Sequence, residues 1–271
     1  ILKESPLPEP APAGRKSPAD SSISFDNVTF TYDGAARPAL MNVRFHLPQG
    51  AAYALVGPSG GGKSTIARLI PRFFDVQEGA VLVGGQDVRS IPAAELMEQI
   101  SFVFQEVHLF KKSIRDNIRA ARPNATEEEI LHAAHLAQCG DILEKIPGGL
   151  DAVIGAKGVY LSGGEMQRIA LARAILKDAP IVVLDEASSF ADPENEVKIQ
   201  KAFEALMKGK TVLMIAHRLP TVRRMDRILV VKKGVVVEEG KHDELIEKGG
   251  VYASMWEEYQ KAAQWKVGGE E

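Results

Sequence analysis

The chain contains the sequence Gly57-Pro58-Ser59-Gly60-Gly61-Gly62-Lys63-Ser64-Thr65, which fits the pattern G-x-x-x-x-G-K-[ST]. An apolar run from Ala51 to Val56 precedes it and predicts a buried strand, while residues 66–70 suit the first turns of a helix. A strand, a glycine-rich loop and a helix N-terminus in this order turn backbone N–H groups and a partial positive charge toward an anion. The alternative is an ordinary glycine-rich turn, which the flanking strand and helix argue against. We therefore predict a phosphate-binding loop, in which Lys63 reaches the β- and γ-phosphates of a nucleotide and Ser64 ligates Mg²⁺.

The composition is that of a soluble globular protein with enough apolar material for a core. Of its 271 residues 45% are hydrophobic and 25% charged, which allows one large domain or two small ones. The net charge of −3 argues against nucleic-acid binding through bulk electrostatics. Cys139 is the single cysteine, so an intrachain disulfide is impossible and a reducing compartment is expected. No apolar run is long enough to span a membrane, and a first residue of Ile1 rather than Met suggests a fragment of something longer.

Strand and helix signals alternate along most of the chain. Residues 1–22 are rich in proline and predict an extended linker with a further segment upstream. Thr126 and Glu129 have capping-box spacing at the start of one helix, and Asp192-Pro193 opens another. The expected strands cover 23–32, 43–47, 51–56, 80–83, 181–184, 211–216 and 227–231, and the expected helices cover 124–138, 165–176 and a stretch from 192 toward 209. This order predicts an α/β sheet, interrupted between about 106 and 165 by a mostly helical insert.

Two acids follow the apolar run Ile181–Leu184, and they supply the second half of a nucleotide site. Asp185 is placed to hold Mg²⁺ through water, and Glu186 is placed to polarise an attacking water as general base. Taken alone, an apolar strand that ends in two acids is common and would indicate only solvated charge. It becomes informative because it lies about 120 residues after the phosphate loop and shortly before a capped helix. We therefore predict that Asp185 and Glu186 belong to the nucleotide site.

A second anion-binding segment is predicted at Leu161-Ser162-Gly163-Gly164-Glu165. A serine hydroxyl, two glycine amides and a following helix N-terminus can cradle a phosphate, although a plain glycine turn that caps a helix is the simpler alternative. Together with Met166-Gln167-Arg168, however, the segment resembles the signature motif of ATP-binding cassette (ABC) ATPases, with Glu165 where glutamine is commoner. The resemblance runs from about Ile23 to Gln260.

Other residues match this family in its usual order. Tyr32 corresponds to the aromatic residue that stacks on adenine, and Gln105 to the glutamine that senses Mg²⁺ and the transmembrane partner. His217 corresponds to the switch histidine that contacts the γ-phosphate, and Ser189-Phe190-Ala191-Asp192 to the D-loop. Singly, these could be a strand-end aromatic, a surface amide and a histidine satisfied at a strand terminus. Six motifs in family order exclude coincidence.

The resemblance implies a P-loop NTPase fold of the α/β class. This fold has a RecA-like parallel sheet core, an antiparallel β subdomain and an inserted α-helical subdomain. The implied ranges are a linker at 1–22, the first part of the core at 23–105, the helical signature subdomain at 106–165, the second part of the core with a C-terminal helix at 166–262, and a polar tail at 263–271.

The resemblance also implies a head-to-tail dimer in which two chains enclose two ATP molecules with Mg²⁺. The catalytic residues would be Glu186, His217, Lys63 and Gln105, and the metal ligands Ser64, Gln105 and Asp185. The remaining nucleotide contacts are with Tyr32, Gly57, Pro58, Ser59, Gly60, Gly61, Gly62, Lys63, Ser64 and Thr65 of one chain, and with Ser162, Gly163, Gly164 and Glu165 of the other.

Two further stretches resemble exporters within this family. They are the segment from Glu106 to Ile118 and the C-terminal region with Gly240-Lys241-His242-Asp243-Glu244-Leu245 and Gly250-Val251-Tyr252. The expected partners are a second copy or paralogue of the domain and the transmembrane domain of the same transporter, at the cytoplasmic face of the inner membrane. No nucleic acid is expected. The alternatives are the ATPase of an importer or of a nucleic-acid maintenance machine, and a non-catalytic nucleotide-binding regulator.

The chain departs from the exporter pattern in places that do not remove a catalytic residue. Gly155-Ala156-Lys157-Gly158 stands where Gly-Glu-Arg-Gly is usual, which puts a contact with the opposite membrane domain in doubt. Phe190-Ala191 alters the D-loop surface. His132, His135 and Cys139 fall on one predicted helix, but without a fourth ligand they are better explained as incidental than as a metal site.

Overall fold

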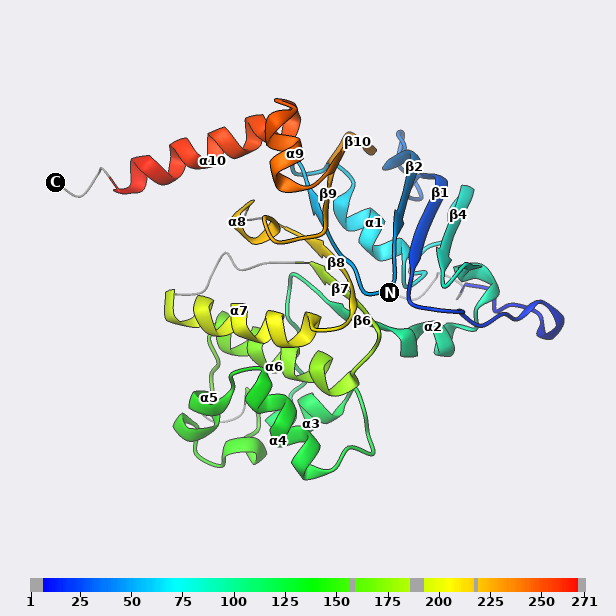
Figure 1. Ribbon diagram of the computed structural model, residues 1–271. Coiled ribbons are helices and arrows are strands. Elements are labelled where there is room, and N and C mark those ends of the chain that lie inside the picture. The colour runs from blue at the N-terminus through cyan, green and yellow to red at the C-terminus, as the bar shows by residue number, and fades with distance from the viewer. Residues whose placement is uncertain (1–6, 156–158, 186–192, 217–218, 268–271) are drawn as a thin grey trace. The chain divides into compact units, whose positions relative to one another are not determined.

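The structure is a computed structural model that describes residues 7–155, 159–185, 193–216 and 219–267. Within these ranges it describes the side chains as well, except those of Pro193 and of residues 263–267. It divides into two compact units (Figure 1). Unit 1 comprises Ile1–Gln99 and Thr211–Glu271, and unit 2 comprises Ile100–Lys210. These units are defined by tertiary contacts. The domain ranges expected from the sequence are defined by motifs instead, and they stay a prediction.

An antiparallel sheet forms the first layer of unit 1. Its strands are β1 (Ile23–Phe30), β2 (Leu40–Leu47), β4 (Glu78–Val83) and β5 (Gln86–Asp87), in the order β2-β1-β4-β5. Side chains alternate between a buried and a more exposed face along β1, as expected of a sheet covered on one side. Phe25 and Phe45 stack across the β1–β2 pair with ring centroids 4.7 Å apart. This sheet is the predicted antiparallel β subdomain.

A second set of strands in unit 1 carries the phosphate loop. β3 (Ala52–Val56) lies between β8 (Thr211–Ile215) and β9 (Arg227–Lys232) and is parallel to both. β10 (Val235–Gly240) pairs with β9 in an antiparallel hairpin. The strands β3 and β8 are almost wholly apolar because both of their faces are buried. The parallel core predicted from the sequence is confirmed.

Short helices complete unit 1, together with one long C-terminal helix. They are η1 (Pro12–Gly14), α1 (Lys63–Leu69), η2 (Val88–Ser90), α2 (Ala93–Gln99), α8 (Leu219–Val222), α9 (His242–Glu247) and α10 (Val251–Val267). The first turn of α10 is anchored by the Glu238 carboxylate, which accepts hydrogen bonds from the amides of Val251 (2.6 Å) and Tyr252 (3.0 Å). Beyond this turn α10 leads away from α9 (Figure 1) and continues to Val267, into the stretch predicted as a polar tail.

Unit 2 is a helical cluster attached to two parallel strands. β6 (Ile100–Val103) pairs with β7 (Ile181–Asp185). The helices are α3 (Ile114–Arg119), α4 (Glu127–Leu136), α5 (Gly140–Lys145), η3 (Gly149–Asp151), α6 (Gly163–Lys177) and α7 (Pro193–Met207). α6 is the central helix and packs against α3, α4 and α7. The Thr126–Glu129 capping box starts α4 as predicted, so the helical insert is confirmed.

The observed strands differ from the expected ones at their boundaries, and β5, β6 and β10 were not among the expected strands. β2 and β4 begin earlier than predicted because Leu40 and Glu78, at their starts, still pair with β1. β6 was not predicted, since four residues give too short a pattern to recognise. The described part of the proline-rich segment, residues 7–22, belongs to unit 1, where the Lys16 amide donates to the Ser90 carbonyl (2.9 Å) and the Ala19 amide to the Gly84 carbonyl (3.1 Å). Within the described part of the chain, no helix combines the length and the apolar character needed to cross a membrane.

Candidate nucleotide-binding site

The predicted phosphate loop connects β3 to α1 in unit 1, and its glycines are required by its backbone. Gly57 has a φ of +137° and Gly62 a φ of +109°, values that residues with a Cβ rarely adopt. A Cβ on Gly57 would lie 2.0 Å from the carbonyl oxygen of Val231 in β9, and one on Gly62 would lie 3.0 Å from the Ala39 carbonyl oxygen. The loop thus packs closely against the backbone of Val231 and Ala39 on one side, which leaves its opposite side for a ligand.

Lys63 lies inside the curve of this loop. Its ammonium donates hydrogen bonds to the carbonyls of Gly57 (2.8 Å) and Pro58 (2.9 Å), and the residue is only 7% exposed. A buried lysine charge next to the N-terminus of α1 gives the loop a positive potential. This is the electrostatic arrangement that a polyphosphate requires.

Tyr32 lies beside the loop, as the sequence predicted for a residue of the same site. Its hydroxyl is 3.1 Å from the Thr65 hydroxyl, and its ring makes edge-to-face contacts with Phe30 and Phe74 at centroid distances of 4.8 and 5.2 Å. These contacts hold the ring at the rim of a pocket of about 280 Å³. The pocket is lined by Tyr32, Ala39 and residues 60–65, so Ala39 is a lining residue that the sequence did not reveal.

In unit 2, the structure brings Gln105 and Asp185 to one edge of the strand pair. β6 and β7 run parallel with Val103 opposite Leu184, so the residues that follow them emerge at the same carboxyl-terminal edge. Asp185 is 7% exposed, whereas Gln105 is exposed. A glutamine amide oxygen and an aspartate carboxylate are both oxygen donors, the kind of ligand that Mg²⁺ prefers. The residues present therefore fit the predicted metal.

Ser162 and Glu165 form a capping box at the start of α6. The Ser162 Oγ accepts from the Glu165 amide (3.2 Å), and the Glu165 Oε2 accepts from the Ser162 amide (2.7 Å). The Glu165 Oε1 also accepts from the Lys145 ammonium (3.1 Å). Burial raises the pKa of the Glu165 carboxyl, but the hydrogen bonds from Ser162 and Lys145 outweigh it and hold that pKa below its ordinary value. Glu165 is therefore ionised at neutral pH, and its charge is paired.

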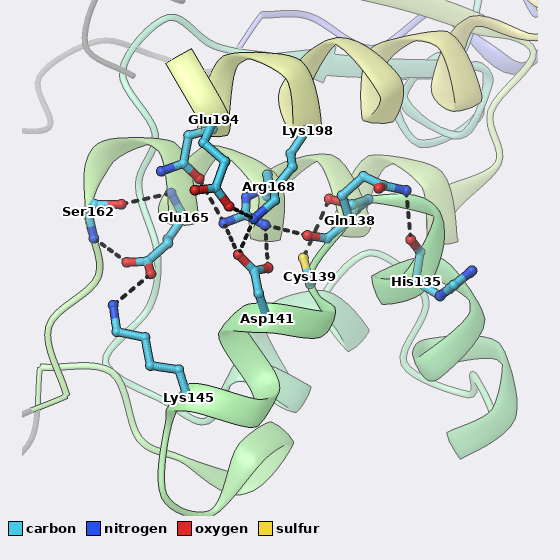
Figure 2. Close-up of polar contacts among 12 residues, drawn as sticks. His135, Gln138, Cys139, Asp141, Lys145, Ser162, Glu165, Arg168, Glu194 and Lys198 are labelled. Carbon is cyan, nitrogen blue, oxygen red and sulfur yellow. Dashed lines mark hydrogen bonds and ion pairs between the residues drawn. The ribbon is translucent and has the colours of Figure 1, made fainter. Parts of the chain in front are cut away.

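One turn further along α6, Arg168 joins three elements of unit 2 (Figure 2). Its guanidinium donates to the Asp141 carboxylate of α5 at 2.6 and 3.2 Å, to the Asn195 side chain of α7 at 2.8 Å, and to the Gln138 carbonyl. Asp141 also pairs with Lys198 of α7 at 2.8 Å. The Arg168 side chain is 1% exposed, so these bonds replace the water that its two terminal nitrogens would otherwise bind. This network was not predicted from the sequence.

Several predicted residues lie outside the described part of the structure. They are Glu186, His217, Ala156-Lys157-Gly158 and the D-loop Ser189-Phe190-Ala191-Asp192. Of the helix residues weighed as metal ligands, His132 and His135 are exposed while Cys139 is buried. Among the residues that the structure describes, no group of three or more His, Cys, Asp and Glu side chains could hold a metal ion.

Comparison with known proteins places this chain among close relatives. The family model described as ABC transporter matches residues 40–189. The ATP-dependent lipid A-core flippase of Escherichia coli K12 is 50% identical over 238 residues, which are 88% of this chain and 41% of the flippase. The flippase of Shigella flexneri matches to the same extent. A solved bacterial Atm1-family ABC exporter with ATP bound superimposes with a TM-score of 0.83 at 38% identity, covering 95% of this chain and 44% of that one. The chain thus spans about two fifths of the length of these relatives.

Proposed function

Because the chain belongs to the ABC transporter family and is an ATPase domain like those of its exporters, we propose that it binds and hydrolyses ATP to drive export across a membrane. The observation that carries this proposal is the phosphate loop, in which the Gly57 and Pro58 carbonyls hold the Lys63 ammonium and a Cβ on Gly57 or Gly62 would meet neighbouring backbone. The exported molecule is recognised elsewhere in the transporter.

The proposed roles follow from the chemistry of each residue. Lys63 and the loop amides hold the β- and γ-phosphates, and Tyr32 stacks on the adenine. Ser64, Gln105 and Asp185 would hold Mg²⁺, which when bound neutralises charge that develops on the phosphates. Glu186 accepts a proton from the attacking water, and His217 orients the γ-phosphate.

The proposed working unit is a head-to-tail dimer. A helix N-terminus with a serine hydroxyl and glycine amides is a second anion site in the same chain, and ATP bound at the phosphate loop of a second copy or a paralogue gives it a ligand. Ser162, Gly163 and Gly164, with Glu165 in their capping box, would then complete the partner's site. Closure of this dimer couples hydrolysis to movement of the transporter.

The transmembrane partner has a suitable docking surface in unit 2. A groove of about 570 Å³ is bordered by Phe104 and Phe110, which are 48% and 56% exposed. The Arg173 guanidinium lies 5.5 Å from the Phe110 ring centroid and holds that ring in place. Exposed aromatic rings around a groove are typical of interaction sites, and the membrane part of the transporter is the proposed occupant. The location that follows is the cytoplasmic face of the inner membrane.

The test is Mg·ATP hydrolysis measured against protein concentration, for the chain itself and for Lys63→Ala. We expect specific activity to rise with concentration, because each site needs two chains, and we expect Lys63→Ala to lose nucleotide binding. Lys201→Ala is the matched control, since this exposed lysine of α7 lies outside the proposed site. Normal ATP binding by Lys63→Ala would refute the phosphate-loop assignment.

A further inference from the structure

A carboxylate in the proposed anion-binding segment creates an electrostatic problem. Glu165 lies three residues after Ser162, in the turn that is proposed to face the triphosphate of the partner chain. Its side chain is 10% exposed, so water screens its charge poorly. A negative charge held there without compensation would repel the nucleotide. The usual glutamine at this position would not.

Lys145 supplies the compensating charge from a different helix. It is the last residue of α5, and its ammonium lies 3.1 Å from the Glu165 Oε1. Figure 2 shows the Lys145 side chain reaching from α5 to the carboxylate, which in turn points toward Ser162. The two residues are twenty positions apart in the sequence, so the pair exists only because the fold brings the end of α5 near the start of α6.

The same contacts determine which donors of the turn can meet an anion. The Ser162 amide is occupied by the Glu165 Oε2, and the Ser162 Oγ accepts from the Glu165 amide. The Ser162 hydroxyl proton is therefore available for donation outward, beside the first-turn amides of Gly163 and Gly164, which a helix leaves without intrahelical acceptors. Glu165 thus orients Ser162 as long as its carboxylate accepts the hydrogen bond from the Ser162 amide.

We propose that Lys145 is a positioning residue of the ATP site, which holds the Glu165 carboxylate in the capping box and neutralises its charge, so that Ser162 can bind the partner chain's triphosphate. This inference rests on the proposed function, because it needs ATP at the signature segment. Lys145 itself does not touch the nucleotide. Its side chain is 70% exposed, so its replacement leaves the core of unit 2 intact.

The test is a double-mutant cycle with K145M, E165Q and K145M/E165Q, measured as kcat and KM for ATP at low and high salt. We expect K145M to raise KM about five-fold at low salt with kcat changed by less than about two-fold, because the uncompensated carboxylate opposes ATP-driven closure. K145R should restore the wild-type KM. In the E165Q background the same lysine substitution should change KM by less than about 1.5-fold, because no charge remains to be neutralised. K201M serves as the control for removing an exposed lysine.

Each outcome bears on a different claim. An equal effect of K145M in the Glu165 and E165Q backgrounds would show a merely structural role and overturn the inference. An unchanged KM for K145M, in a wild-type protein that hydrolyses ATP cooperatively, would overturn the inference and leave the proposed function standing. Absence of hydrolysis and of ATP-dependent dimerisation in the wild type would overturn the proposed function, and the inference with it.

Discussion

Replacing Gly57 by alanine tests whether the phosphate loop depends on the close approach of β9. The new Cβ would lie 2.0 Å from the Val231 carbonyl oxygen, more than 1 Å inside ordinary contact, and Gly57 also has a φ of +137°. Strain at such a φ costs about 1–3 kcal/mol, and displacing packed backbone costs about 1–3 kcal/mol more. The free energy of unfolding should therefore fall by roughly 2–6 kcal/mol, a large part of the stability of an ordinary domain.

Gly60 is the matched control within the same loop. It also has a positive φ, +72°, but a Cβ there would meet nothing within 4 Å. Gly60→Ala should therefore cost only about 1 kcal/mol, from the left-handed backbone alone. Urea denaturation measures both variants, and a fluorescence titration with ATP should show that Gly57→Ala also binds more weakly. Losses of stability that agree within about 1 kcal/mol would refute the steric argument.

Three further predictions concern unit 2 and the proposed catalytic base. Arg168→Met should lower the free energy of unfolding, measured in urea, by about 2–3 kcal/mol. This is below the usual cost of breaking a buried pair because Asp141 is 45% exposed. Lys198→Met should lower the free energy of unfolding by less than Arg168→Met does. Burial raises the pKa of Asp141, but Arg168 and Lys198 outweigh it and lower that pKa to about 2. Asp141→Asn should therefore lower the free energy of unfolding by about 1 kcal/mol at neutral pH. This loss should vanish as the pH falls from about 4 to 2, because the wild-type carboxylate is then protonated. A loss that does not change with pH would contradict the ion pairing. Glu186→Gln should keep ATP binding and accumulate the dimer while hydrolysis falls by orders of magnitude, and unchanged turnover would remove Glu186 as the base.

Features built from neighbouring residues could be predicted from the sequence. The phosphate loop was recognisable because its donors are successive backbone groups between one strand and one helix, which the pattern G-x-x-x-x-G-K-[ST] specifies. The capping box at Thr126 and Glu129 was recognisable for the same reason, since both partners lie within one turn. The position of Asp185 could be predicted because it comes directly after a wholly apolar run, and such a run indicates a buried strand.

Features made by distant residues could not be predicted in this way. β6 is too short to leave a periodic pattern, and only its pairing with β7 places Gln105 and Asp185 at one strand edge. Arg168 could be assigned to the signature motif from the sequence, but its bonds to Asp141 and Asn195 depend on where the fold places α5 and α7 around α6. A local pattern carries no record of such packing.

Glu165 shows where the boundary between the two lies. The sequence by itself determined that this chain has a phosphate loop, a signature segment and an acidic residue in place of the usual glutamine, because each of these is a property of adjacent residues. Only the tertiary structure decided that the acid is paired with Lys145. An ion pair requires two side chains within about 4 Å, and the fold brings these two together across twenty positions of the sequence.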